Sequence, residues 1–493
     1  MSPLIASSPS TIRKYLFYVA LLTVFGAGLW LILASGSRVG SDRIVRGIPG
    51  QAWSISPSAE QSQPATRSSY ARHILWENLR SPLSILFLQI VVIIVATRLF
   101  RRLFQKIGQP PVMGEMVAGI FLGPSVLGLL SPETMVFLFP DSSMVTLRLL
   151  SQIGVVLFMF VVGMELNVQH LRDKGPAAIM ISHASIVVPF FLGAALSLFL
   201  YTPLAPANTS FNAFALFIGV AMSITAFPVL ARILEDRGMS QTYLGSIAIT
   251  CAAVDDVTAW CLLALVIATV KAGGIASSFV TIVLVSVFTC VMIFLIKPQL
   301  GHLIKDRAGN EKHSSGLVAA TLAFVLICAL FTEVIGIHAL FGAFLAGVVM
   351  PSVPGFRVFL KEKLESFSSS ALLPLFFVFT GLRTQISLLN DWYSWLLCVV
   401  IVAVAIVGKF GGSTLMARWT GMNWHDSFSL GILMNTRGLI ELVVLNIGYD
   451  LGILSARIFA MMVLMALATT FMTGPLLSLA RFKRQDAIAM NPQ

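Results

Sequence analysis

Charged side chains are scarce in this sequence. Asp, Glu, Lys and Arg together make up 11% of the 493 residues, less than half of the roughly 25% that is usual in soluble globular domains. Hydrophobic residue types account for 57% of the chain, and the mean hydropathy is +0.88. A soluble domain cannot hide this much apolar surface from water, so the composition excludes a soluble protein and predicts one that crosses a membrane many times.

Cysteine is scarce as well, and its placement excludes two kinds of site. All five cysteines fall within apolar runs: Cys251, Cys261, Cys290, Cys328 and Cys398. Their spacing builds neither a disulfide framework nor a zinc site, so we interpret them as small packing residues. No stretch resembles a soluble nucleotide-binding or regulatory domain, and we expect neither a cofactor nor an enzymatic activity.

Long apolar runs are what the sequence has instead. A helix of roughly 20 residues crosses the hydrocarbon core of a bilayer, and the chain is therefore predicted to be an all-α polytopic membrane protein. The predicted spans are 15–35, 82–100, 110–130, 147–167, 176–201, 211–234, 243–270, 275–296, 314–334, 337–351, 368–388, 393–417, 425–448 and 455–480. We interpret 1–36 as a membrane anchor or a signal, 37–81 as a flexible external loop, 82–480 as the membrane domain and 481–493 as a tail.

Positive charge is distributed unevenly among the loops. Lys and Arg concentrate on the side that holds Arg13 and Lys14, which predicts cytoplasmic termini if the first segment is retained, and we expect a bacterial inner membrane. The smaller set on the other side includes Arg148 and Arg383. Because this topology accounts for the net charge of +11, no nucleic acid partner is expected.

Two neighbouring aspartates, Asp255 and Asp256, interrupt the span 243–270. Each charge at the centre of a membrane helix costs roughly 2.5–3.5 kcal/mol on insertion scales, so such a pair predicts an ion or proton site. Adjacent helical residues point about 100° apart, so both carboxylates cannot face one partner. Lys409 lies in the middle of another span and is predicted to pair with one of them, with snorkelling to the interface as the alternative.

Two spans carry residues that break helices. In the span 211–234, Pro228 follows Thr225 and predicts a bend or an unwound turn, although a simple kink would explain it too. In the span 425–448, Asn435, Thr436 and Arg437 precede a glycine. Glu441 lies four residues after Arg437, on the same helical face, and the pair is either functional or an internal salt bridge.

The two interrupted spans occupy corresponding places in the chain. Each is the fifth span of one half of 82–480, and the single span 275–296 links the halves. An odd number of linking spans leaves the halves oppositely oriented, which is typical of transporters built from inverted repeats, with the site between the broken helices. Two further polar residues lie at span ends. Glu115 is either near an access path or simply interfacial, and His338 is either a pH sensor or an interfacial polar residue.

Four motifs resemble a known family. PVMGEMVAGIFLGP at 111–124, FPVLARIL at 227–234, AVDDVTAW at 253–260 and NTRGLIEL at 435–442 are similar to the second family of monovalent cation:proton antiporters, in particular its cation/proton exchanger branch. The resemblance covers about 82–480. It implies about 13 helices in two inverted repeats, with crossed broken helices, a dimerisation domain, a core domain and a homodimer. One extra helix precedes this fold.

The resemblance also divides the roles of the acidic pair. It implies that Asp256 binds the cation and that Asp255 is the partner of Lys409. The predicted function is exchange of Na⁺ or K⁺ for protons by alternating access, with both ions competing for Asp256 and the Thr225 hydroxyl completing the oxygen shell. A cation channel and a non-transporting sensor on the same fold remain alternatives, although a buried Lys409 opposes a conducting cation path. An aspartyl protease is disfavoured because neighbouring aspartates cannot share a proton across facing helices.

Overall fold

The computed structural model describes residues 20, 23–35, 78–79, 81–165, 175–239, 242–271, 275–307, 314–351 and 356–489. Every regular element in these ranges is a helix, which confirms the all-α prediction. Most of the predicted external loop 37–81 lies outside the described residues. The last helix, α23, runs from Ala456 to Ala489, so the predicted tail 481–493 begins as a continuation of that helix.

The predicted spans correspond closely to the observed apolar helices. Within the described residues, ten helices are long and apolar enough to cross a membrane, or eleven if one bent pair is counted as a span. Three shorter apolar helices lie at Thr23–Ser35, Ala339–Val349 and Leu373–Leu388, where three of the shorter spans were expected. The amphipathic helix α17 (Phe356–Phe367) was not predicted, because its apolar residues do not form a long run.

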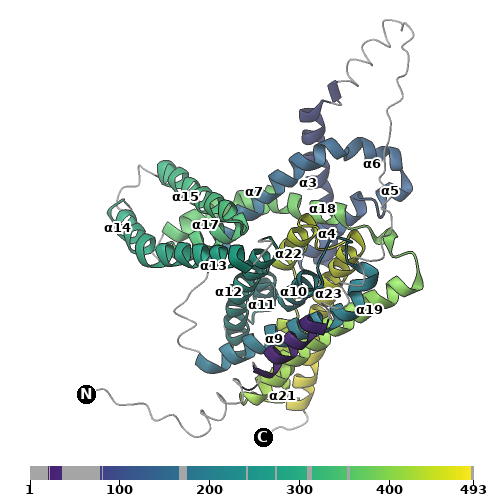
Figure 1. Ribbon diagram of the computed structural model, residues 1–493, viewed down its shortest axis with the longest axis vertical. Coiled ribbons are helices and arrows are strands. Elements are labelled where there is room, and N and C mark those ends of the chain that lie inside the picture. Colours follow the sequence, from purple (N-terminus) through teal and green to yellow (C-terminus); the bar gives the residue numbers. More distant parts are fainter. Residues whose placement is uncertain are drawn as a thin grey trace, which may run out of the picture.

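One set of helices, called the scaffold helices below, packs together in the upper part of Figure 1. Helices α7 and α16 pack closely, because a Cβ atom on Gly163 would meet the Phe344 carbonyl oxygen at 2.2 Å. Small residues of this kind let membrane helices pack backbone against backbone. The scaffold helices are α3 (Pro82–Lys106), α4 (Pro111–Leu122), α7 (Asp141–Glu165), α15 (Ser314–Ile335), α16 (Ala339–Val349) and α18 (Leu373–Arg383).

A second set, called the core helices, lies below the first in Figure 1 and contains both broken spans. Helix α9 lies at its centre and contacts α10, α12 and α20. The N-terminal helix Thr23–Ser35 rests on α9, with the rings of Phe25 and Phe191 4.9 Å apart. The core helices are α9 (Gly175–Leu204), α10 (Phe211–Ser223), α11 (Phe227–Asp236), α12 (Tyr243–Lys271), α19 (Trp392–Ile406), α20 (Gly412–Trp419), α21 (Trp424–Met434), α22 (Leu439–Asp450) and α23.

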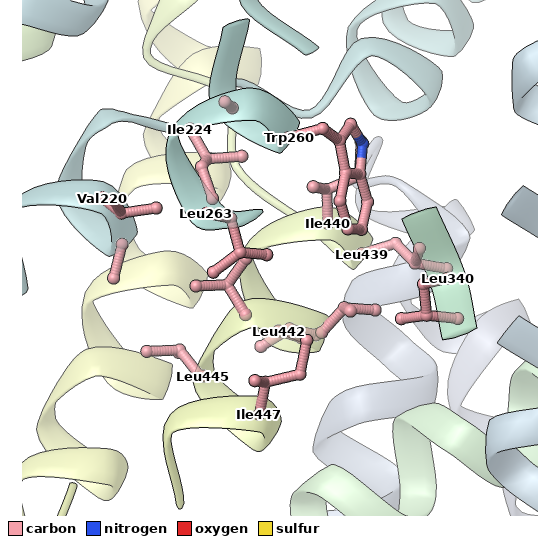
Figure 2. Packing of buried hydrophobic residues seen from close by; sticks show 14 of the residues in the cluster. Val220, Ile224, Trp260, Leu263, Leu340, Leu439, Ile440, Leu442, Leu445 and Ile447 are labelled. Carbon is pink, nitrogen blue, oxygen red and sulfur yellow. The ribbon is translucent and has the colours of Figure 1, made fainter. Parts of the chain in front are cut away.

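The two sets meet across a layer of buried apolar side chains. Figure 2 shows Trp260 and Leu263 of α12 packed near Leu439 and Ile440 of α22, with Leu340 of α16 on the scaffold side. All five side chains are at most 3% exposed. The linking span 275–296 is formed by α13 (Ile275–Cys290) and a π-helical turn (Val291–Ile296), and α14 (Lys297–Arg307) continues it.

Candidate functional site

The first broken span is interrupted between α10 and α11. Helix α10 ends at Ser223, the backbone is extended at Ile224, and α11 begins at Phe227. Pro228 lies in the first turn of α11, where its missing N–H removes no helical hydrogen bond. The predicted interruption is present, but the proline starts the second half-helix instead of kinking a continuous one.

The second broken span crosses the first at its interruption. Helices α21 and α22 meet at a bend of 42°, and Asn435 forms the C-cap of α21. The Ala226 N–H donates to the Thr436 carbonyl over 3.0 Å, so the two interrupted segments bond directly to each other. A Cβ atom on Gly438 would approach the Val229 side chain to 2.7 Å, which leaves room only for glycine. The crossed broken helices that the resemblance implied are therefore present.

Arg437 holds the two broken spans together where they cross. Its fully buried guanidinium donates to the carbonyl oxygens of Ala221 at 3.0 Å and Met222 at 2.7 Å, in the last turn of α10. It also contacts the Glu441 carboxylate at 3.1 Å, as the spacing predicted. The Arg437 N–H and carbonyl both bond to the hydroxyl of Thr470 on α23. A cation at the C-terminus of a half-helix satisfies orphan carbonyls and complements the helix dipole.

Lys409 reaches the same helix end from another direction. It lies in a π-helical turn (Val407–Gly411) and is fully buried. Its ammonium donates to the Ser223 carbonyl, to the Ser185 carbonyl at 3.1 Å and to Asp255 at 3.2 Å. The structure thus brings Lys409 to Asp255, and its side chain does not extend to the membrane interface. Two buried cations, Arg437 and Lys409, therefore lie around the end of α10.

Asp255 is surrounded by donors. Ser182 donates to one carboxylate oxygen at 2.5 Å, and Ser185 donates to the other at 2.8 Å. Thr225 and Lys409 also donate to this second oxygen, at 2.5 and 3.2 Å. These four donors, one of them charged, compensate the burial of the Asp255 carboxylate.

Asp256 has a different environment from its neighbour. Its side chain is 1% exposed, and its Oδ1 atom has no hydrogen-bond partner among the described residues. A buried carboxylate oxygen without a partner is costly unless something else neutralises it. Of the two adjacent carboxylates, Asp256 is therefore the one with capacity left to bind a proton or a cation. At the crossing, Glu441 Oε2 and Asn435 Oδ1 likewise have no partner among the described residues.

Two serines of this site were not predicted from the sequence. Ser182 and Ser185 lie three residues apart on one face of α9, and that spacing was the only signal for them. The Thr225 hydroxyl, predicted to complete the oxygen shell of the cation, donates to Asp255. Its part in a cation shell stays a prediction.

Glu115 and His338, the two candidates at span ends, lie in different surroundings from the aspartates. Glu115 is buried in α4 at 4% exposure, and its carboxylate is 3.7 Å from the Arg101 guanidinium, so it is not an interfacial group open to water. His338 accepts from the Leu340 N–H at the start of α16 and lines a cavity together with Asp450.

Comparisons with known proteins agree with this architecture. The family described as sodium/hydrogen exchanger, transmembrane, matches residues 73–482. The Na(+)/H(+) antiporter NhaS4 of Synechocystis is 46% identical over 395 residues, which cover 80% of this chain and 96% of that protein. Cation/H(+) antiporter 17 of Arabidopsis thaliana is 42% identical over 81% of this chain, and K(+)/H(+) antiporter 1 of Saccharomyces cerevisiae is 34% identical over 82%.

The lengths of these relatives differ. The match spans 48% of the plant protein and 47% of the yeast protein, so the chain covers about half of each. Among solved structures, the sodium proton antiporter MjNhaP1 of Methanocaldococcus jannaschii is similar, with a TM-score of 0.56 over 82% of this chain and 97% of that one. At 13% identity this likeness shows a shared fold.

Proposed function

The chain belongs to the sodium/hydrogen exchanger family, and we propose that it is a secondary antiporter that exchanges a monovalent cation, Na⁺ or K⁺, for protons across a membrane. One observation carries the proposal: the two adjacent carboxylates differ in their partners. Asp255 accepts from three hydroxyls and Lys409, whereas Asp256 keeps a buried oxygen without a partner. The names of the relatives, which include both Na(+)/H(+) and K(+)/H(+) antiporters, support the same function and leave both cations open.

Asp256 is the exchanging group in this proposal. Its single negative charge is neutralised either by a proton or by one monovalent cation, so the two ions compete for the same carboxylate. The interrupted segments add backbone carbonyls outside helical hydrogen bonding, and such oxygens suit hard cations. Thr225 acts through Asp255, which it holds in place, and is a positioning residue in this scheme. Competition at one site, with access alternating between the two sides, suffices for antiport.

The alternatives find less support. A channel would require a cation to pass the Lys409 ammonium, which is fully buried beside the site and repels it. A non-transporting sensor on the same fold would have no need for a buried carboxylate oxygen without a partner. Neither alternative explains the asymmetry between Asp255 and Asp256, and an antiporter does.

The arrangement in the membrane belongs to the same proposal. Residues 82–480 form the transport unit, and the scaffold helices serve as the dimerisation domain of a homodimer. Residues 1–36 anchor the chain, 37–81 are external, and both termini are cytoplasmic in a bacterial inner membrane. The concentration of Lys and Arg on one side supports this orientation. Glu115 near an access path and His338 as a pH sensor stay predictions.

Transport in vesicles tests the proposal. Purified protein is reconstituted with an internal pH dye and challenged with a gradient of Na⁺, K⁺ or Li⁺, and we expect proton flux with at least one cation. Asp256→Asn should abolish this flux, because the amide binds neither a proton nor a cation in exchange. Asp426→Asn on the polar first turn of α21 is the matched control and should transport normally. The proposal is wrong if no cation gradient drives proton flux in the wild type, or if Asp256→Asn shows full flux.

A further inference from the structure

A cavity of about 620 Å³ lies between the scaffold helices α7, α15 and α16 and the core helices α12 and α22. Arg148, Glu333, His338 and Asp450 supply polar groups to its wall. Ile267 of α12 lines it as well, three turns beyond Asp256, which is about 16 Å along a helix. The cavity therefore approaches the exchanging carboxylate without reaching it.

Apolar side chains separate this cavity from Asp256. Between Asp256 and Ile267 on α12, the side chains of Trp260 and Leu263 are each 2% exposed. Figure 2 shows them packed in one cluster with residues of α22 and with Leu340 of α16. A hydrated cation cannot cross such a dehydrated layer, so the path from the cavity to the site is closed in this structure.

One carboxylate ties the half-helix α22 to the scaffold helices beside this closed path. Asp450, at the end of α22, accepts from Arg148 of α7 at 2.9 Å and from Arg383 of α18 at 2.8 Å, one arginine on each oxygen. Among ion pairs whose partners are both described, these two alone connect a core helix to a scaffold helix. The opposite charges thus concentrate at one end of the interface.

A neighbouring turn of α22 reinforces the contact. The Asn446 side chain accepts from Arg383 at 3.1 Å and donates to the Thr380 hydroxyl of α18 at 2.8 Å. The Arg383 guanidinium also lies 5.2 Å from the ring of Tyr449. Arg148 is 40% exposed, so water can replace its bond to Asp450 when the helices part.

We propose that Asp450, held by Arg148 and Arg383, is a latch that keeps the path between the cavity and Asp256 closed. This inference rests on the proposed antiport, because alternating access requires that path to open. Opening it moves α12 and α22 away from α7, α16 and α18, and this movement separates Asp450 from both arginines. The latch stabilises the closed arrangement, and its release lets the cavity extend to the site.

Cysteine accessibility tests the latch directly. Leu263→Cys places a thiol within the apolar layer, and Gln152→Cys of α7, at a half-buried position, places one in the cavity wall. A charged, membrane-impermeant thiol reagent is applied to intact cells and to inverted vesicles, and labelling of the parent protein is subtracted. Adding Asp450→Asn should raise the labelling rate at Leu263→Cys several-fold from the side of the cavity. The rate at Gln152→Cys should stay the same, since that position lines the cavity in either state.

The outcomes separate the latch from the proposed function. An unchanged rate at Leu263→Cys, with normal labelling at Gln152→Cys, would overturn the latch even if exchange is intact. Absent exchange in the wild type would remove the antiport proposal, while the labelling would still report on the latch.

If Asp450→Asn does not fold, a reversible disulfide tests the latch instead. With Thr380→Cys and Asn446→Cys together, a disulfide between α18 and α22 should stop exchange on oxidation and restore it on reduction. Normal exchange with a disulfide verified by mass spectrometry contradicts the proposal.

Discussion

At the scale of single residues, neighbours decide what each acidic side chain does. Asp255 and Asp256 are adjacent in the sequence, yet one is saturated with donors and the other is not. The acidic pair and Lys409 could be predicted because charges are rare and expensive inside a membrane. Ser182 and Ser185 could not, because serine is ordinary in membrane helices and its partner depends on how α9 is rotated against α12.

The buried pair makes a prediction about stability. Lys409→Ala should lower the melting temperature in detergent more than Asp255→Asn does. The alanine leaves the charge of Asp255 and two carbonyl oxygens without their donor and opens a cavity, and breaking a buried pair this way costs about 3–5 kcal/mol. The asparagine keeps the shape and still accepts hydrogen bonds. Equal melting temperatures of both variants and the wild type would argue against the pair as a structural element.

At the scale of elements, the crossing is held by cations at the end of one half-helix. Arg437 binds two carbonyls of the last turn of α10, and Lys409 binds a third, from Ser223. The sequence predicted both interruptions, since Pro228 and the glycine after Arg437 break the apolar pattern. It did not predict that the proline begins a helix or that an arginine caps a different chain segment, because both depend on how the half-helices cross.

Arg437→Lys tests the geometry of this cap while keeping its charge. A lysine cannot bind two carbonyls and a carboxylate as the planar guanidinium does, so we expect a loss of about 1–3 kcal/mol, the range for a buried polar group left unsatisfied. Arg232→Lys is the matched control, because Arg232 is 55% exposed on α11, and it should melt with the wild type. A normal melting temperature for Arg437→Lys would show that a positive charge alone is enough to stabilise the crossing.

The contact between α7 and α16 predicts a strong effect of one added methyl group. A Cβ atom at Gly347 would meet the Phe160 carbonyl oxygen at 2.1 Å, so Gly347→Ala must push the helices apart. We expect low yield and a lower melting temperature. At Gly316 of α15 no atom lies within 4 Å, so Gly316→Ala should be neutral or slightly stabilising. Similar behaviour of the two variants would show that α7 and α16 do not need their close approach.

At the scale of the whole molecule, two sets of helices meet across an apolar layer with the site on one side of it. The motifs predicted the family, and the match to the sodium/hydrogen exchanger family confirms it. The distribution of basic residues predicted that Arg148 and Arg383 lie on the same side of the membrane. It could not predict that both form ion pairs with Asp450. Residues so far apart in sequence become neighbours only when the halves of the chain fold against each other.

Competition between the two ions should appear in the stability of the entire protein. A ligand that binds only the folded state adds about 2.7 kcal/mol when its concentration is about 100 times its Kd. The transported cation should therefore raise the melting temperature at alkaline pH, relative to choline at equal ionic strength. The shift should shrink as the pH falls, because protons then occupy Asp256. In Asp256→Asn no shift should occur at any pH. A cation shift that persists in this variant, or that grows on acidification, would mean that cation and proton do not share this carboxylate.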